Sequence, residues 1–365
     1  MPPLEIAGRC ERVRQRFEQS QALLVSDLNN IRWLTGFTGS NGWLLVFPDD
    51  VVLVTDGRYG DQATAQLAKA GVDGRVLVGR SSAAIFDTLA AEVAPLPSLG
   101  FEAAHLTYEQ FQRFDGLFET TLVPVGGLVE TERRRKDAGE IARIAEACRI
   151  ADAALSEVQL LGRTEARVRD ELEIRMRELG ADGPSYETIV ATGPINAARP
   201  HHRPTGTMIE AGHTVIIDVG ALYDGYHSDM TRTFFALDAT PQQLELYDVV
   251  LAAQCAGVAA VEAGISTAEL DAVCRDVITE AGYGEWFSHG TGHGVGLLIH
   301  EDPFINRTGD LKLQVGDVVT VEPGVYREGF GGIRVEDLVV VTENGCRVLT
   351  ASPKDSPCLP SPPMT

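Results

Sequence analysis

The stretch 214–235, TVIIDVGALYDGYHSDMTRTFF, decides the fold of the second half of the chain, because it contains two apolar runs joined by a tight turn. Asp224-Gly225 lies between the runs, and this dipeptide is a strong signal for a two-residue β-hairpin. With the turn centred there, Asp218 faces Thr231 and Asp229 lies diagonally on the same face. With the turn centred one residue earlier, Asp218 faces Asp229 directly. In both registers the two carboxylates point to one side of the hairpin, with side-chain origins roughly 5–8 Å apart.

Asp218 is unusual because it is a carboxylate within an apolar run, residues 215–219. Burying a carboxylate is costly unless something neutralises it, and a second carboxylate beside it raises the pKa of both. A metal cation would resolve this conflict. Two separate salt bridges, for example one to Arg232, are the alternative interpretation.

A second pair of acids lies in the next predicted hairpin. Glu322 follows the apolar run 318–321, and Glu336 alternates with apolar residues on the returning strand, where it shares a face with Arg334. The glycine-rich return at residues 329–332 allows Glu322 and Glu336 to face each other. Neutralisation of one acid by Arg334 alone is the alternative to metal binding.

The segment between these hairpins, FSHGTGHGVGLLIHEDP at residues 287–303, interleaves histidines with glycines. Its three histidines are His289, His293 and His300. An isolated histidine is more often a hydrogen-bonded structural residue than a ligand, but three beside four interior acids favour a functional role. His201 and His202, in ARPHHRP, add two more candidates.

Four carboxylates and one imidazole would form a hard, oxygen-rich site, which suits manganese or a similar divalent ion better than a thiolate-type zinc site. Four acids exceed the needs of one ion, so a pair of ions bridged by carboxylates is the natural arrangement. Two such ions can hold a hydroxide and polarise a carbonyl, which is hydrolytic chemistry.

The first part of the chain alternates predicted strands and helices, which indicates a small α/β domain. We expect the first domain to occupy residues 1–128. The second, an α+β domain built on antiparallel hairpins, occupies residues 129–352, and residues 353–365 form a flexible tail. At 365 residues the chain exceeds what one hydrophobic core usually organises, which agrees with two domains.

Composition excludes several classes of function. The net charge of −21 would repel a polyanion, so nucleic-acid binding is not expected. No run approaches the roughly 20 apolar residues of a membrane-spanning helix, and the polar start lacks the apolar core of a signal peptide. The six cysteines form no CxxC pair, as expected for free thiols in a reducing compartment. These features predict a cytoplasmic protein.

Four segments in the second half, in this order, resemble the pita-bread metallopeptidases, a family that includes methionine aminopeptidase, aminopeptidase P, prolidase and creatinase. The segments are IDVGALYDGYHSDMTRTF, HGTGHGVGLLIHEDP, TVEPGVY and GGIRVEDLVVVTENG, at residues 217–234, 289–303, 320–326 and 331–345. The resemblance implies two divalent ions per chain, manganese by preference, with cobalt or zinc as alternatives. It implies these five ligands: Asp218, Asp229, His293, Glu322 and Glu336.

The same resemblance implies roles for individual side chains. Asp229 and Glu336 would bridge both ions. Glu322 would shuttle a proton between the water and the leaving nitrogen. His201 and His300 would hold the scissile carbonyl and steady the tetrahedral intermediate. Two further residues fall at substrate-contact or ligand-supporting positions, His289 and Arg334, and Thr231 and Thr320 would hydrogen-bond ligand carboxylates.

The first half is similar to the amino-terminal domain of prolidase, aminopeptidase P and creatinase, through NIRWLTGFTGSNGWLLV at residues 30–46 and VLVTDGRYGDQA at 52–63. Methionine aminopeptidase lacks this domain, and creatinase lacks the metal-binding acids. The resemblance therefore implies a homodimeric enzyme that cuts the bond between a first residue and a following proline.

Two substrate classes stay open, together with a third possibility. A prolidase cleaves Xaa-Pro dipeptides, and the short spacing between Glu322 and Glu336 favours it. An aminopeptidase P acts on longer peptides, and the segments TGFTGSNG and TDGRY are more typical of it. A non-catalytic binding module is the alternative of a different class, but all five ligand positions are filled here.

Overall fold

The computed structural model describes residues 1–17 and 21–358. The chain divides into two compact units, which we call the amino-terminal unit (Pro3–Arg133) and the carboxyl-terminal unit (Met1–Pro2 with Arg134–Thr365). The units meet at Arg133 and Arg134 instead of residue 128, because helix α6 (Leu128–Arg133) packs with α1 (Arg9–Arg14) and α2 (Leu28–Thr35).

The amino-terminal unit is an α/β domain around a mixed six-stranded sheet of order β4-β3-β2-β1-β5-β6. The strands are β1 (Leu23–Val25), β2 (Gly42–Val46), β3 (Val51–Asp56), β4 (Arg75–Gly79), β5 (Ser98–Glu102) and β6 (Thr121–Val125). The remaining helices are α3 (Gly60–Ala70), α4 (Ser82–Val93) and α5 (Tyr108–Leu117). Strands β2 and β3 form a hairpin through Pro48-Asp49-Asp50, with Val46 opposite Val51. Apolar residues of α4 and α5, including Leu89 and Phe114, pack in one core with β1, β2 and β3.

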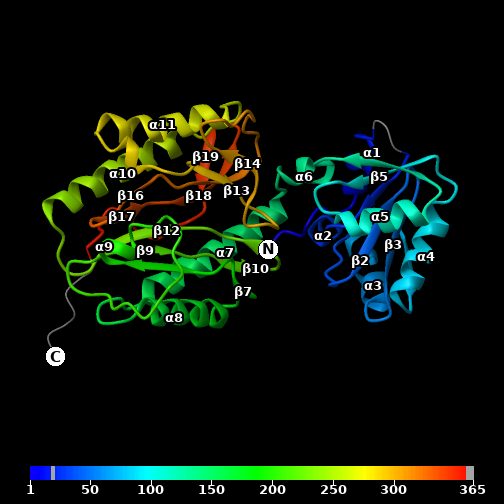
Figure 1. Ribbon diagram of the computed structural model, residues 1–365, viewed down its shortest axis with the longest axis horizontal. Helices are drawn as coiled ribbons and strands as arrows, with labels where there is room; N and C mark the ends of the chain where they lie inside the picture. The colour runs from blue at the N-terminus through cyan, green and yellow to red at the C-terminus, as the bar shows by residue number, and fades with distance from the viewer. Residues whose placement is uncertain (18–20, 359–365) are drawn as a thin grey trace. The chain divides into compact units, whose positions relative to one another are not determined.

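In the carboxyl-terminal unit, two pairs of helices enclose antiparallel strands (Figure 1). One pair is α7 (Ala138–Glu157) and α8 (Glu165–Glu178); the other is α10 (Pro241–Ala260) and α11 (Thr267–Glu280). Each pair packs in a separate apolar core with the strands. Two short helical turns complete the set, α9 (Gly193–Asn196) and the 3-10 helix η1 (Gly284–Trp286). The prediction of an α/β domain followed by an α+β domain is confirmed.

The strands of this unit form several small sheets. Their bounds are β7 (Gly183–Pro184), β8 (Ile189–Thr192), β9 (Thr214–Asp218), β10 (Ala221–Tyr223), β11 (Tyr226–His227), β12 (Thr231–Phe235), β13 (Gly292–Gly294), β14 (Glu301–Ile305), β15 (Val318–Val321), β16 (Gly324–Arg327), β17 (Gly331–Arg334), β18 (Asp337–Thr342) and β19 (Gly345–Val348). The sheet orders are β12-β9-β8, β11-β10-β7, β14-β13-β15-β18-β19 and β16-β17.

The hairpin at residues 214–235 has the first of the two predicted registers, with Asp218 opposite Thr231. Asp224 and Gly225 both have positive φ, as a type I′ turn requires. The two strands are not continuous, however, because the tip forms a separate sheet from β9 and β12. At the break, a Cβ on Gly220 would lie 2.0 Å from the Ser228 carbonyl oxygen, so only glycine fits this close approach.

Residues 353–358, the first part of the predicted flexible tail, contact other segments of the carboxyl-terminal unit, and residues 359–365 lie outside the described residues. The Phe235 amide donates to the Pro357 carbonyl at 2.8 Å, and the Tyr247 hydroxyl donates to the Lys354 carbonyl. The tail is held because its backbone and its Lys354 ammonium both find partners in the carboxyl-terminal unit. No helix in residues 1–17 and 21–358 is long and apolar enough to cross a membrane.

Candidate metal centre

The first pair of acids lies where strand β9 ends and just before β12 begins. Tyr186, in the segment before β8, donates its hydroxyl to Oδ1 of Asp218 and, at 2.5 Å, to Oδ1 of Asp229. Arg334 donates from Nη2 to Oδ2 of Asp218 at 2.6 Å. The two carboxylates therefore converge on one side of the hairpin, as either predicted register required.

The second pair of acids lies between two ladders of one long hairpin. Val321 pairs with Asp337, and Gly324 pairs with Arg334. Continuing this register places Glu322 opposite Glu336. Thr231 donates to Oε2 of Glu336 at 2.7 Å, which connects this hairpin to the β9–β12 hairpin.

His293 lies on β13, which the glycines on either side allow to pack tightly. A Cβ on Gly292 would lie 2.1 Å from the Thr320 carbonyl oxygen, so β13 could not approach β15 with a larger residue there. Thr320 accepts from the His293 amide at 3.0 Å and donates to Oε1 of Glu322 at 3.3 Å. Nε2 of His293 lies 3.5 Å from oxygens of both Asp229 and Glu322.

These side chains form a cluster that suits a cation. Asp229, His293 and Glu336 each offer one ligand atom, and these atoms lie within 4.8 Å of one another. Asp218 and Glu322 contact the same group through Tyr186 and His293. The structure thus brings together all five residues that the sequence proposed as ligands.

The pKa values of the clustered carboxyl groups are raised by burial and by the charges of neighbouring acids, and a bound cation would offset both effects. Burial, and then the charges of Asp218 and Glu322, raise the pKa of Asp229 well above its usual range. Burial and the charge of Asp229 do the same for the pKa of Glu336. Burial raises the pKa of Glu322 to about 8, against the opposing charge of Arg334. Carboxylates crowded in this way are the donors that hard divalent ions prefer, so the residues present fit such ions.

The imidazole of His293 is suited to be a ligand because it is neutral. Burial, and then the neighbouring His300, lower its pKa to about 4. The rings of His293 and His300 lie with centroids 4.4 Å apart and nearly perpendicular. A neutral imidazole keeps a lone pair for a metal near pH 7.

A cavity of about 330 Å³ opens over the cluster. Its polar lining includes Asp218, Glu322 and Arg334 together with three histidines, and its apolar lining includes Ile189, Pro200 and Phe304. The three histidines are His201, His289 and His293. His300 is exposed and borders His293. A peptide in this cavity would meet the acids, the histidines and an apolar wall.

Arg334 and His289 make most of their contacts with the protein itself. Arg334 donates to Thr231, Asp218, Tyr326 and the Pro200 carbonyl, which leaves one of its five N–H groups. His289 lies 3.0 Å from the Tyr326 hydroxyl, and burial, then Arg334, lower the pKa of its imidazole to about 4. Both residues therefore orient neighbours as well as line the cavity.

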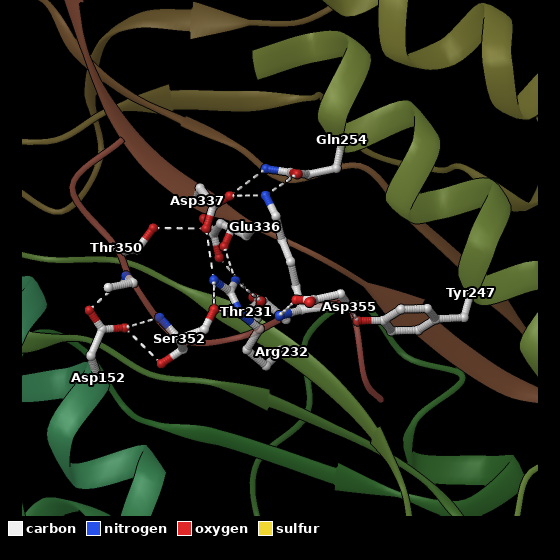
Figure 2. A network of polar contacts seen from close by, with 12 residues as sticks. Asp152, Thr231, Arg232, Tyr247, Gln254, Glu336, Asp337, Thr350, Ser352 and Asp355 are labelled. Atoms are coloured by element: carbon white, nitrogen blue, oxygen red, sulfur yellow. Dashed lines mark hydrogen bonds and ion pairs between the residues drawn. The ribbon is translucent and has the colours of Figure 1, made fainter. Parts of the chain in front are cut away.

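A buried polar network surrounds Asp337 and the backbone of the neighbouring Glu336, one of the clustered acids (Figure 2). Arg232, on β12, donates to Oδ1 of Asp337 at 2.8 Å and to the Glu336 carbonyl at 2.5 Å. It also donates to the Ser352 carbonyl at 2.7 Å. Lys354 pairs with the second oxygen of Asp337. This network fixes Glu336 and its strand against β12.

Sequence reasoning missed Tyr186 and the partner of His202. Tyr186 stands in an unremarkable segment, and only the folded chain brings it to the two aspartates. His202 was singled out beside His201, but its Nε2 lies 2.9 Å from Oε2 of buried Glu165, so its imidazole belongs to the hydrogen-bond network of Glu165. No local pattern marks either residue.

Comparison with known families agrees with this geometry. Residues 142–343 match the model of metallopeptidase family M24, and residues 9–134 match the creatinase/prolidase N-terminal domain. The uncharacterized peptidase YqhT of Bacillus subtilis is 39% identical over 95% of this chain and 99% of its own length.

Solved structures are also similar. The Xaa-Pro dipeptidase from Bacillus anthracis is 38% identical, with a TM-score of 0.92 over 96% of this chain and 99% of that one. The X-Pro aminopeptidase from Thermotoga maritima is 33% identical, with a TM-score of 0.87 over 96% of this chain and 100% of that one. Both similarities span both units of the chain.

Proposed function

Because the chain belongs to metallopeptidase family M24, we propose that it hydrolyses the bond between a first residue and a following proline, and that its preferred substrates are Xaa-Pro dipeptides. The observation that carries the proposal is the convergence of four carboxylates on His293, beside a cavity that Asp218, Glu322 and His293 line together with His201 and His289. Similarity to an Xaa-Pro dipeptidase along nearly the whole chain supports the substrate class.

We assign the metal ligands as Asp218, Asp229, His293, Glu322 and Glu336, holding two divalent ions that we propose to be manganese. When bound, such ions activate water and polarise a carbonyl at neutral pH. Other side chains of the protein orient the proposed ligands. Tyr186, Arg334 and Thr231 hold Asp218, Asp229 and Glu336 through the hydrogen bonds described above.

The remaining chemistry falls to side chains around the cavity. An Xaa-Pro bond is a tertiary amide, and its proline nitrogen must gain a proton to leave. Glu322 would hold that proton at a carboxyl oxygen and pass it on. His201 and His300 would donate to the scissile carbonyl oxygen as charge develops there. His289 and Arg334 would contact the substrate or fix its neighbours.

A matched pair of variants tests the role of Glu322. Glu322→Gln keeps the shape of the side chain but cannot carry the proton, so we expect kcat with manganese to fall at least about 100-fold. Glu328→Gln changes an exposed acid of the same hairpin and should keep wild-type kcat. Equal kcat values for the two variants would contradict the proposed role.

The alternative substrate class is favoured by a specific observation, the similarity to an X-Pro aminopeptidase. The cavity, at about 330 Å³, lies at the small end of the range for ligand sites and favours a dipeptide. We expect faster hydrolysis of an Xaa-Pro dipeptide than of an Xaa-Pro-Xaa tripeptide with manganese. Turnover of the tripeptide alone would establish the aminopeptidase instead.

Two physical measurements complete the test. Metal analysis of protein dialysed with manganese should find two ions per chain, which we assign to the carboxyl-terminal unit. Asp229→Asn should lose both ions together. A non-catalytic module need not bind them.

Light scattering should give twice the mass of one chain, because we propose a homodimer. We also propose a cytoplasmic location, which cell fractionation would check.

A further inference from the structure

A second cluster of metal-ligating side chains lies in the amino-terminal unit, apart from the proposed active site. Asp27, His105 and Glu130 each offer one ligand atom, and these atoms lie within 4.8 Å of one another. Nε2 of His105 lies 3.4 Å from Oδ2 of Asp27 and 3.7 Å from Oε1 of Glu130. We propose that these three residues bind a zinc ion.

The cluster occupies a favourable place in the sheet. Strands β1 and β5 are parallel neighbours, and Asp27 and His105 follow their carboxyl ends. From β1 the chain moves through β2 and β3 to β4 on one side, whereas from β5 it moves to β6 on the other. Ligands of open α/β sheets bind in the crevice outside the carboxyl ends of the strands, where the winding direction reverses.

The Asp27 carboxylate has an unused, buried oxygen directed at this crevice. Its side chain is 7% exposed. Oδ1 accepts from the Asn29 amide and caps helix α2. Oδ2 has no hydrogen-bond partner among residues 1–17 and 21–358, and the nitrogens of His105 and Arg133 lie 3.4 and 3.8 Å from it. A buried oxygen without a partner is costly and calls for a bound cation or donor.

The local charge balance favours a cation. Glu102 is buried beside the cluster and accepts from the Asp27 amide at 2.8 Å. Asn30 bridges the carboxylates of Glu102 and Glu130 through its Nδ2, at 2.6 and 2.7 Å. Arg133 supplies one positive charge close to Asp27. The carboxylates of Asp27, Glu102 and Glu130 thus lie close together, and a divalent ion beside them would offset part of their negative charge.

The two distances from the His105 nitrogen to its carboxylate neighbours are compatible with zinc. Zinc bonds of about 2.0–2.2 Å in a tetrahedron separate neighbouring ligand atoms by about 3.4 Å. The His105 contacts to Asp27 and Glu130, at 3.4 and 3.7 Å, are close to this edge length. Imidazole nitrogens and carboxylate oxygens are both among the ligand atoms that zinc takes in proteins.

A polar cavity leads to the cluster and leaves a fourth coordination position for solvent. Its volume is about 430 Å³, and Asp27 and His105 both line it. The other polar lining residues are Ser26, Asn29, Ser40, Asn41 and Gln110. The ion would thus be reached from solvent and remain open on one side.

Equilibrium dialysis of the full chain against zinc, with metal analysis, tests the proposal. Because the proposed active-site ligands could also take up zinc during dialysis, the difference between variants is the measured quantity. His105→Gln changes an exposed side chain, and Asp27→Asn keeps a good helix cap. We expect each to hold one zinc ion fewer per chain than wild type. Glu119→Gln, an exposed acid of the same unit, should hold the wild-type number.

Anomalous diffraction at the zinc edge from crystals of the wild-type chain gives a second measurement, independent of the variants. A peak between Asp27, His105 and Glu130 is expected. Zinc contents that are equal in wild type and His105→Gln, or a map without this peak, would overturn the proposal. Circular dichroism of each variant checks that lost zinc does not reflect lost structure.

Discussion

Asp229 carries an electrostatic cost in the metal-free protein because its pKa is raised by burial and by Asp218 and Glu322. A folded-state pKa above the unfolded value of about 3.9 means that folding is favoured by protonation. The stability that this group contributes is therefore present below about pH 4 and is lost as the pH rises through the folded pKa.

We therefore predict that Asp229→Asn stabilises the chelator-treated protein at pH 8, because it removes one of the repelling charges while Oδ1 can still accept from Tyr186. Each kcal/mol gained should raise Tm by about 2–4 °C. Calorimetry with chelator measures this shift. With manganese the order should reverse, since only wild type gains binding energy; a variant that is less stable in both conditions would contradict the prediction.

Tyr186 is predicted to support the metal centre, because its hydroxyl holds Asp218 and Asp229 together. Loss of such a supporting hydrogen bond typically costs 10–100-fold in metal affinity or activity. We expect Tyr186→Phe to weaken manganese binding by about that factor in calorimetric titration. Tyr223→Phe, on β10, serves as the control, and unchanged affinity in Tyr186→Phe would show that the hydroxyl has no such role.

At the scale of single residues, the proposed metal ligands could be identified from the sequence more readily than the residues that hydrogen-bond to them. Asp218 and Glu336 stand out because an acid in an apolar strand has no ordinary explanation. Tyr186 does not stand out, because a tyrosine near a strand is common and its partners are 32 and 43 residues away. A distant pairing leaves no local pattern.

The segment between β8 and β9 carries His201, and the buried carboxylate of Glu165 organises it. Oε1 of Glu165 accepts from the Thr192 amide at 2.8 Å, and Oε2 accepts from the Thr205 amide at 2.9 Å. Burial raises the pKa of this carboxyl, but the hydrogen bonds from His202, Thr205 and Thr192 prevail and lower it. Its contribution to stability is thus present above the unfolded pKa of about 4.3 and lost as the pH falls through the folded pKa.

We predict that Glu165→Gln destabilises the protein by about 3 kcal/mol at pH 7, because several hydrogen bonds to a buried charge are weakened. The penalty should shrink as the pH falls below about 4. Urea midpoints measured from pH 7 to pH 3.5 follow it, with Glu171→Gln, an acid farther along the same helix, as the control. A penalty that is constant across this range would exclude the proposed titration.

The network in Figure 2 ties the tail to the strands that carry the metal ligands. Arg232 and Asp337 are each 2% exposed, and removing one partner leaves a buried, uncompensated charge. Asp337→Ala should therefore cost about 3–5 kcal/mol in denaturant unfolding. Asp355→Ala removes an exposed acid from the same tail and should change stability by less than about 0.5 kcal/mol.

At the scale of elements, the sequence predicted the hairpin and limited it to two registers because Asp224-Gly225 marks the turn, and the observed register is the one centred on that dipeptide. The break at Gly220 could not be predicted, since it depends on the approach of Ser228 from the opposite strand. The contacts of the tail could not be predicted either, because its proline-rich composition is typical of disorder and Tyr247 lies 107 residues from its partner Lys354.

At the scale of the whole molecule, the chain has separate apolar cores in its two units. The core around Leu89 and Phe114 belongs to the amino-terminal unit, and the two cores flanking the metal centre belong to the carboxyl-terminal unit. The division into units does not follow the chain order strictly, because Met1–Pro2 belong to the carboxyl-terminal unit. Arg143 of that unit donates to the Pro2 carbonyl at 3.2 Å.

Units with separate cores can unfold in separate transitions, and a ligand stabilises only the unit that binds it. We therefore predict two calorimetric transitions for the full chain, with saturating manganese raising the Tm of one of them. Asp337→Ala should lower the Tm of that same transition, because Asp337 supports Glu336 from within the carboxyl-terminal unit. A single transition that manganese moves as a whole would instead show that the two units unfold cooperatively.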